Sequence, residues 1–217
     1  MKKLSGSVVV MIGIGLLVSN CSRTVTGGTG GDGDLPENAR MVNLVWKPTL
    51  SVQDFDLEPL GIYKSIGVSF FSISDIRQDP RIIGKTFEDL KIRKTMVPIA
   101  TKVNIARWCK SAFESTCHTI AVKNDNKKGS LRLEIEITDF SINDDYTQTG
   151  TASLRINALT GDGMLIWEGR INGTSDLYVH GTDSDGISEC LSNTVMVTLH
   201  NVFADQSFRD AVEKSIQ

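Results

Sequence analysis

Alternation of apolar and polar residues marks the strands that this chain is expected to form. The segment Leu131–Ile137 has an apolar residue at every second position, which predicts a strand with one face in the core and one in water. Similar alternation, or a short apolar run bounded by turn residues, predicts further strands. These are expected at Val42–Trp46, Lys64–Arg77, Thr95–Ala100, Ala152–Ala158 and Met164–Gly173. Gly161-Asp162-Gly163 separates the last two and is typical of a hairpin turn.

Prolines mark interruptions in the first half of this pattern. Asp79-Pro80 predicts a turn, followed by a polar connection to about Lys94. Pro98 cannot donate a backbone hydrogen bond, so Thr95–Ala100 is expected at a sheet edge or a strand end.

A change of period predicts three helices. Ile105, Cys109 and Phe113 recur every four residues, which indicates an amphipathic helix over about Thr101–Ser115. Apolar residues at helical spacing predict a second helix over about Gly186–Phe203. A third, shorter helix is expected after it, with Asp205 as N-cap and with Phe208 and Val212 pointing inward. The element order predicts an α+β fold, a mostly antiparallel sheet with helices packed on one face.

The N-terminus has the pattern of a lipoprotein signal peptide. Lys2 and Lys3 precede the uncharged run Val8–Val18, which is shorter than the roughly 20 residues of a membrane-spanning helix. Cys21 follows in the sequence LVSNC, which resembles a bacterial lipobox. The resemblance implies cleavage before Cys21 and acylation of its side chain and new amino group, which would anchor the protein to a membrane.

Composition divides the rest of the chain into a linker and one domain. Residues 21–40 combine Cys21 with a Gly-rich, nearly apolar-free stretch that is expected to be a flexible tether. Residues 41–217 are enough for a single domain with its own core. Lys and Arg number 23 against 26 Asp and Glu, so no basic excess exists to bind nucleic acid.

The order of elements and four local sequences resemble the YajG family of bacterial envelope lipoproteins. The likeness rests on the lipobox Cys21, on the strand ending SISDIR, on the strand that leads into the Thr101–Ser115 helix, and on the closing TVMVTLHNVFADQSFRDAVEK. It covers roughly Ile66–Lys214 and implies location and fold rather than an activity. By resemblance to known sorting habits, Ser22 after Cys21, with no Asp there, favours the outer membrane, with the domain facing the periplasm.

No motif in the sequence indicates catalysis, a cofactor or a metal. The chain lacks G-x-S-x-G and H-E-x-x-H, and its three histidines are not at ligand spacing. Asp183-Ser184-Asp185-Gly186 resembles part of a calcium loop, but the bidentate acid would fall at Ser192, so an acidic turn that caps a helix is favoured. His118 is expected in a loop after a helix end.

The densest group of acids does not indicate a hydrolase. It consists of Glu134, Glu136, Asp139, Asp144 and Asp145. Glu134 and Glu136 belong to the polar positions of one alternating strand, so a solvated sheet face is expected.

The cysteines leave two alternatives open. Without Cys21, an odd number remains in a compartment that should be oxidising: Cys109, Cys117 and Cys190. Cys109 and Cys190 both fall on apolar sides of helices that can share a sheet face, so a disulfide between them is possible. The alternative is buried free thiols.

Two functions remain compatible with these features. The favoured one is a non-enzymatic, lipid-anchored envelope protein that binds another envelope protein through an exposed apolar patch or an unpaired sheet edge. The alternative is a lipoprotein that binds a lipid or small ligand, which requires an apolar cavity between helices and sheet.

Overall fold

The computed structural model describes residues 35–90, 93–125, 127, 130–145, 147–177 and 184–216. The expected signal peptide and the lipidation site Cys21 lie outside these residues. The strands are β1 (Arg40–Met41), β2 (Val68–Asp75), β3 (Ile82–Leu90), β4 (Arg93–Ala100), β5 (Leu131–Asp144), β6 (Gln148–Leu159) and β7 (Leu165–Leu177). The α-helices are α1 (Ile105–Thr119), α2 (Ser184–Ala204) and α3 (Gln206–Ser215), and the segments Val52–Asp54 and Glu58–Lys64 are 3₁₀-helical.

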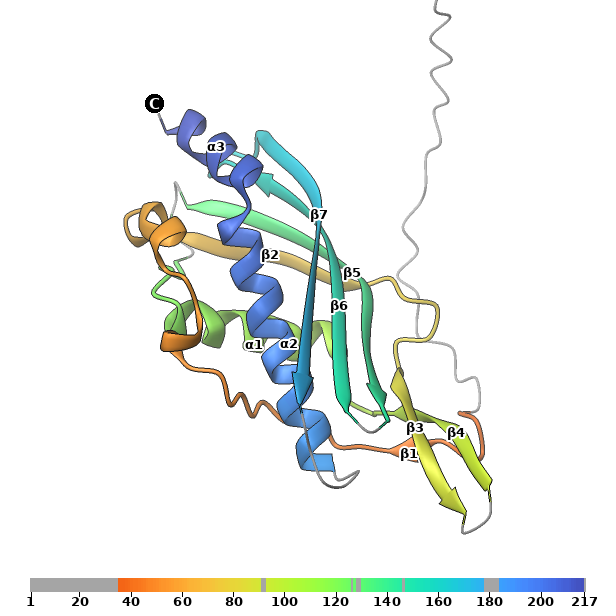
Figure 1. Cartoon of the computed structure of the whole chain (residues 1–217). Helices are drawn as coiled ribbons and strands as arrows, with labels where there is room; N and C mark the ends of the chain where they lie inside the picture. The colour runs from red at the N-terminus through yellow and green to blue at the C-terminus, as the bar shows by residue number, and fades with distance from the viewer. Residues whose placement is uncertain are drawn as a thin grey trace, which may run out of the picture. The chain divides into compact units, whose positions relative to one another are not determined.

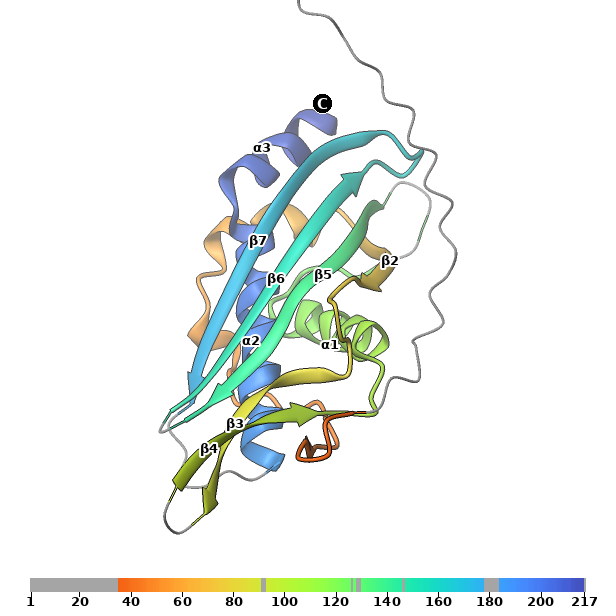
Figure 2. The same ribbon diagram turned by 90° about the vertical axis from the view of Figure 1, so that its right-hand side faces the viewer.

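The strands form one sheet in the order β1-β4-β3-β5-β6-β7, and β2 also pairs with β5. The long pairings of β5 with β6 and of β6 with β7 are antiparallel. The helices pack against the sheet, and in Figure 2 α1 and α2 lie behind the strands, whose other face is turned to the viewer. The expected α+β class, with helices on one face of a mostly antiparallel sheet, is confirmed.

Strand β5 has two different neighbours along one of its edges. Its first part pairs in parallel with β2, and its last residues, Ile142–Asp144, pair in parallel with β3. Arg77 fills the interval between these two neighbours. Its guanidinium makes a bidentate ion pair with Asp75 and donates to the carbonyls of Pro80, Ile82 and Phe140, at 2.7–2.9 Å. Arg77, the last residue of SISDIR, therefore supplies hydrogen bonds to main-chain carbonyls where β5 has no described neighbouring strand on this edge.

The segment between Asp79 and Lys94 was expected to be a polar connection, but it contains strand β3. It pairs with all of β4 but with β5 only over Gly84–Thr86. Most of the β3–β4 hairpin thus extends past β5, so fewer side chains of β3 than of the central strands face the core. The apolar alternation that marks the central strands is therefore absent from the sequence of β3.

The segment Val42–Trp46, expected as a strand, is not a strand in the structure. Val42 and Leu44 are buried, as the alternation predicts, but only Arg40–Met41 pairs in the sheet. The N–H groups of Val45, Lys47 and Thr49 instead donate to side-chain oxygens of α2, at 2.9–3.3 Å. Helix α2 is therefore enclosed by the sheet on one side and by this strap, residues 42–50, on another.

Helix α1 begins later than expected. Asn104 is its N-cap and accepts a hydrogen bond from the N–H of Arg107 at 2.9 Å. The helix continues to Thr119, so His118 lies in its last turn rather than in a loop. At the other end of the chain, Asp205 caps α3 as expected, and Phe208 and Val212 are buried. Among the described residues, no helix has the length and apolar character to cross a membrane.

Candidate functional site

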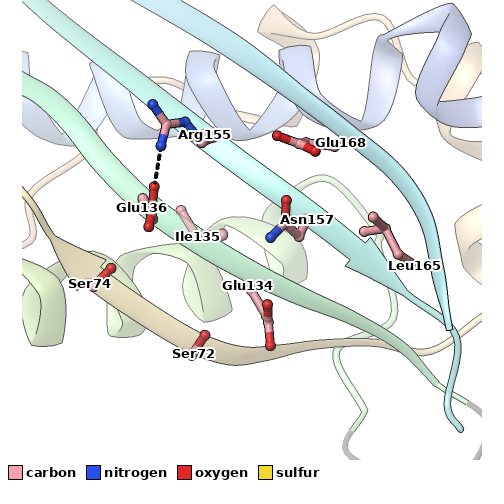
Figure 3. Close-up of a pocket in the computed structure, with 9 residues that line it drawn as sticks. All are labelled: Ser72, Ser74, Glu134, Ile135, Glu136, Arg155, Asn157, Leu165 and Glu168. Carbon is pink, nitrogen blue, oxygen red and sulfur yellow. Dashed lines mark hydrogen bonds and ion pairs between the residues drawn. The ribbon is translucent and has the colours of Figure 1, made fainter. Parts of the chain in front are cut away.

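The uncovered face of the sheet carries a polar hollow of about 310 Å³ (Figure 3). Strands β2, β5, β6 and β7 each contribute to it. Its lining consists of Ser72, Ser74, Glu134, Ile135, Glu136, Arg155, Asn157, Leu165 and Glu168. Three carboxylates, one guanidinium, one amide and two hydroxyls thus meet on one surface.

Strand register brings these side chains together. Glu134 of β5 lies opposite Asn157 of β6, which in turn lies opposite Glu168 of β7. In the next row Glu136 lies opposite Arg155. Side chains at directly opposed positions on one face are close enough to interact.

The charged groups of the hollow are only partly screened from water. Arg155 Nη1 and Glu136 Oε2 form an ion pair at 2.9 Å, with side chains 48% and 43% exposed. Glu168 is exposed and forms no ion pair within the described part of the chain. A hydrolytic pair of carboxylates would converge on one bond in a cleft, whereas Glu136 is engaged by Arg155. The arrangement can bind a polar or charged partner by hydrogen bonds and ion pairs.

Exposed apolar side chains border the hollow at one end. Phe71 of β2 is 61% exposed, and Leu165 at the start of β7 is 53% exposed. The guanidinium of Arg132 lies over the ring of Phe71, 5.4 Å from its centroid. The surface therefore combines a polar centre with exposed apolar side chains at one end.

The acidic group expected from sequence divides into separate environments. Glu134 and Glu136 share the solvated face of β5, as expected. Asp144 is instead buried and accepts hydrogen bonds from Thr86 Oγ1 at 2.7 Å and Gln148 Nε2 at 3.0 Å. In the described ranges, no three His, Cys, Asp or Glu side chains are grouped as a metal site would require.

The described part of the calcium-like sequence lies at the start of helix α2. Ser184 begins α2, and Asp185 lies in the first turn. Lys47 Nζ forms ion pairs with Asp185 at 3.1 Å and with Glu189 at 2.7 Å. Asp183 lies outside the described residues.

The three cysteines are buried free thiols in the structure. Cys190 Sγ contacts the carbonyls of Gln148 and Ser175 beneath β6 and β7. Cys109 lies on α1, close enough to Asp75 and Arg77 for their charges to affect it. The possible Cys109–Cys190 disulfide is thus not formed, since each thiol contacts a different part of the core. Burial raises the pKa of all three thiols, that of Cys190 to about 12.

The sequence alone did not identify Arg155, Asn157 and Glu168 as members of the hollow. Their positions within alternating strands were visible, but their meeting depends on the register between β5, β6 and β7. The expected hairpin at Gly161–Gly163 did offer one signal. Pairing the polar positions on its two sides places Asn157 opposite Glu168.

Comparison with solved structures gives distant likenesses. No protein-family model matches the chain, and no curated protein does. A DUF330 protein from Xanthomonas campestris is similar over 83% of this chain and 97% of its own, with 10% identity and a TM-score of 0.44. PelC from Paraburkholderia phytofirmans, solved as a dodecamer, is similar over 65% of this chain and 88% of its own, with 12% identity and a TM-score of 0.37. A minor lipoprotein from Acinetobacter baumannii is similar over 70% of this chain and 96% of its own, with 6% identity and a TM-score of 0.32. Likenesses this low bear on neither activity nor partners, and none of these three proteins is named as a YajG protein.

Proposed function

We propose that this protein is a lipid-anchored, non-enzymatic lipoprotein of the bacterial envelope, similar to the YajG family, whose domain binds another envelope protein. Cys21 carries the anchor, and the outer membrane, with the domain facing the periplasm, is the proposed location. The uncovered sheet face provides the binding surface.

The observation that carries this proposal is the difference between the two faces of the sheet. One face is covered by α1 and α2, and no described helix covers the other (Figure 2). A face without a covering layer is available to a partner. Its polar hollow and its exposed Phe71 and Leu165 provide both charged contacts and apolar area.

Binding of a lipid or another small apolar ligand is less well supported. Such a ligand needs an apolar cavity between helices and sheet. In that space, buried side chains from α1, α2 and the strands form one contiguous cluster, which includes Phe113, Ile135, Leu191 and Leu199. The hollow on the opposite face is lined mainly by polar groups.

Co-purification of the full-length lipidated protein tests the binding surface. The double variant Glu134→Lys/Glu168→Lys reverses two charges in the hollow. The matched control Glu114→Lys reverses an exposed charge on α1, in the layer on the other side of the sheet. We expect quantitative mass spectrometry to find one partner recovered near stoichiometrically with the wild type and the control and depleted with the double variant. Recovery of all three proteins alone, or equal partner recovery with all three, would refute the assignment.

Membrane fractionation tests the anchor separately. A Cys21→Ala variant lacks the acylated side chain, so we expect it in the soluble periplasmic fraction while the wild type sediments with membranes. A Cys190→Ala variant is the matched control and should sediment like the wild type. A Cys21→Ala protein that still sediments would contradict lipid anchoring.

A further inference from the structure

Strand β7 ends the sheet and pairs with β6 alone among the described strands. In an antiparallel pair, every second residue directs its N–H and C=O away from its neighbour. The carbonyl of Asn172 accepts from Asn201 Nδ2 of α2 at 3.0 Å, so it belongs to this outward set. Glu168 and Arg170 have the same parity. No backbone partner meets their outward groups within the described residues.

Helix α3 lies beside the first half of this edge. It packs near the start of β7 on the helix-covered side, as Figures 1 and 2 both show. Trp167 Nε1 donates to Ser207 Oγ at 2.9 Å, and the Trp167 and Phe208 rings lie 5.0 Å apart. A groove of about 490 Å³ lies between α3 and the start of β7, lined by Met164, Ile166, Ser207, Asp210, Ala211, Lys214 and Ser215. An added strand would have α3 beneath it and this groove within reach of its side chains.

The charges along the edge define what the added strand must carry. Glu168 and Arg170 are exposed on the uncovered face, two residues apart, and neither forms an ion pair within the described residues. Arg170 lies opposite Arg155 of β6, which is already paired with Glu136. A neighbouring strand therefore gains most by placing an acid opposite Arg170 and a base opposite Glu168.

The residue between these two defines the other face of the added strand. Gly169 points toward the helices, and the Trp167 indole occupies the space that its side chain would need, 2.3 Å from an ideal Cβ. An apolar side chain opposite Gly169 would pack against this half-buried indole. The next inward side chain, opposite Trp167, would lie above the groove beside α3.

From this geometry we infer that β7 accepts an extended segment of another protein as an additional antiparallel strand. The segment reads acid–apolar–base–apolar, with its acid opposite Arg170 and its second apolar side chain in the α3 groove. Strand addition of this kind uses main-chain hydrogen bonds for affinity and alternate side chains for specificity. The inference rests on the proposed function only in assigning the segment to an envelope partner.

Two synthetic peptides test it directly. Acetyl-Thr-Glu-Val-Lys-Val-Thr-amide carries the expected pattern, and acetyl-Thr-Lys-Val-Glu-Val-Thr-amide is the matched peptide with its charges exchanged. Fluorescein-labelled forms are titrated with the full-length protein in detergent, and anisotropy gives each Kd. We expect the wild type to prefer the first peptide roughly tenfold, because two opposed charge pairs change sign between the peptides.

Exchanging the charges on the protein should reverse the preference. The variant Glu168→Lys/Arg170→Glu should bind the second peptide better, and Glu114→Lys should behave as the wild type. Ala211→Trp, which fills the groove, should weaken binding of both peptides. Hydrogen exchange should slow at residues 166–170 when peptide binds. Absence of binding, or equal binding of both peptides by the wild type and the charge-exchanged variant, would overturn the inference. Concentration-dependent self-association abolished by Glu168→Lys would also overturn it, because the occupant would then be a second copy.

This outcome is separable from that of the proposed function. Peptide preference without any envelope partner would refute the proposed function and leave the strand-addition site standing. A partner retained by the Glu168→Lys/Arg170→Glu variant, together with failed peptide binding, would refute the site alone.

Discussion

Replacing Arg77 by Met should remove a large part of the stability of this domain. The Arg77 and Asp75 side chains are only 9% and 8% exposed. All five N–H groups of the guanidinium donate hydrogen bonds, two to Asp75 and three to main-chain carbonyls. Met has a similar length but no donor and no charge, so the variant leaves a buried carboxylate without its partner.

The size of the loss follows from that unpaired carboxylate. Removing one member of a buried ion pair costs about 3–5 kcal/mol, against a total stability of roughly 5–15 kcal/mol for a typical domain. Arg77→Lys keeps the charge but has three donors on one nitrogen, so it cannot reach Asp75, Ile82 and Phe140 together. We expect it to lose about 1–3 kcal/mol. Adding Asp75→Asn to Arg77→Met should recover part of the loss, since no buried charge then remains.

Urea unfolding of the full-length protein, followed by circular dichroism, measures these differences. Arg155→Met is the matched control, because it breaks an ion pair of the same type that is about half exposed. That control should lose less than about 1 kcal/mol. An Arg77→Met variant that is no more destabilised than Arg155→Met, or an Asp75→Asn substitution that adds its full cost in the double variant, would contradict a stabilising buried ion pair at Arg77.

Three further predictions concern α2 and its neighbours. Asn193→Ala removes the acceptor of the Thr49 N–H on the strap and should cost about 1–3 kcal/mol in urea unfolding; a loss below about 0.5 kcal/mol would contradict this. Burial raises the pKa of Cys190 to about 12, so the folded state favours the neutral thiol. Stability should then decline as pH rises from about 9 towards 12, and less steeply in Cys190→Ala; parallel pH profiles would count against it. Gly173→Ala places a Cβ 2.7 Å from the Thr198 main chain and should lower the melting temperature clearly, whereas Gly61→Ala, with open space around it, should not.

Elements with a strong period were predictable because one face of each meets the core. Leu131–Ile137 lies within β5, and its alternation matches the alternating burial of that strand. Asp205 was identifiable as a cap because the cap is a local interaction with Phe208, three residues away. Asn104 offered the same signal for α1, whose apolar period begins at Ile105, the first residue of the helix, so the expected start at about Thr101 was too early.

The strap and β3 were not predictable in this way, because their backbone partners lie far away in the sequence. Lys47 donates its N–H to Ser192, and Thr49 to Asn193, across more than 140 residues. An alternating segment shows that one side is buried, but it does not distinguish a neighbouring strand from a helix side chain as the hydrogen-bond acceptor. Strand β3 lacks even the alternation, because most of it pairs with β4 alone.

The same limit applies to the two candidate binding features. The period of a strand shows which side chains face water, so the polar face of β5 was expected. It does not give the order of strands, and only that order makes β7 an edge and brings Glu168 next to Asn157. Glu168 and Arg170 appear in the sequence as ordinary surface charges of a hairpin strand. They become informative because β7 pairs with β6 alone among the described strands, and opposite charges two residues apart along such an edge favour one charge pattern in any strand added to it.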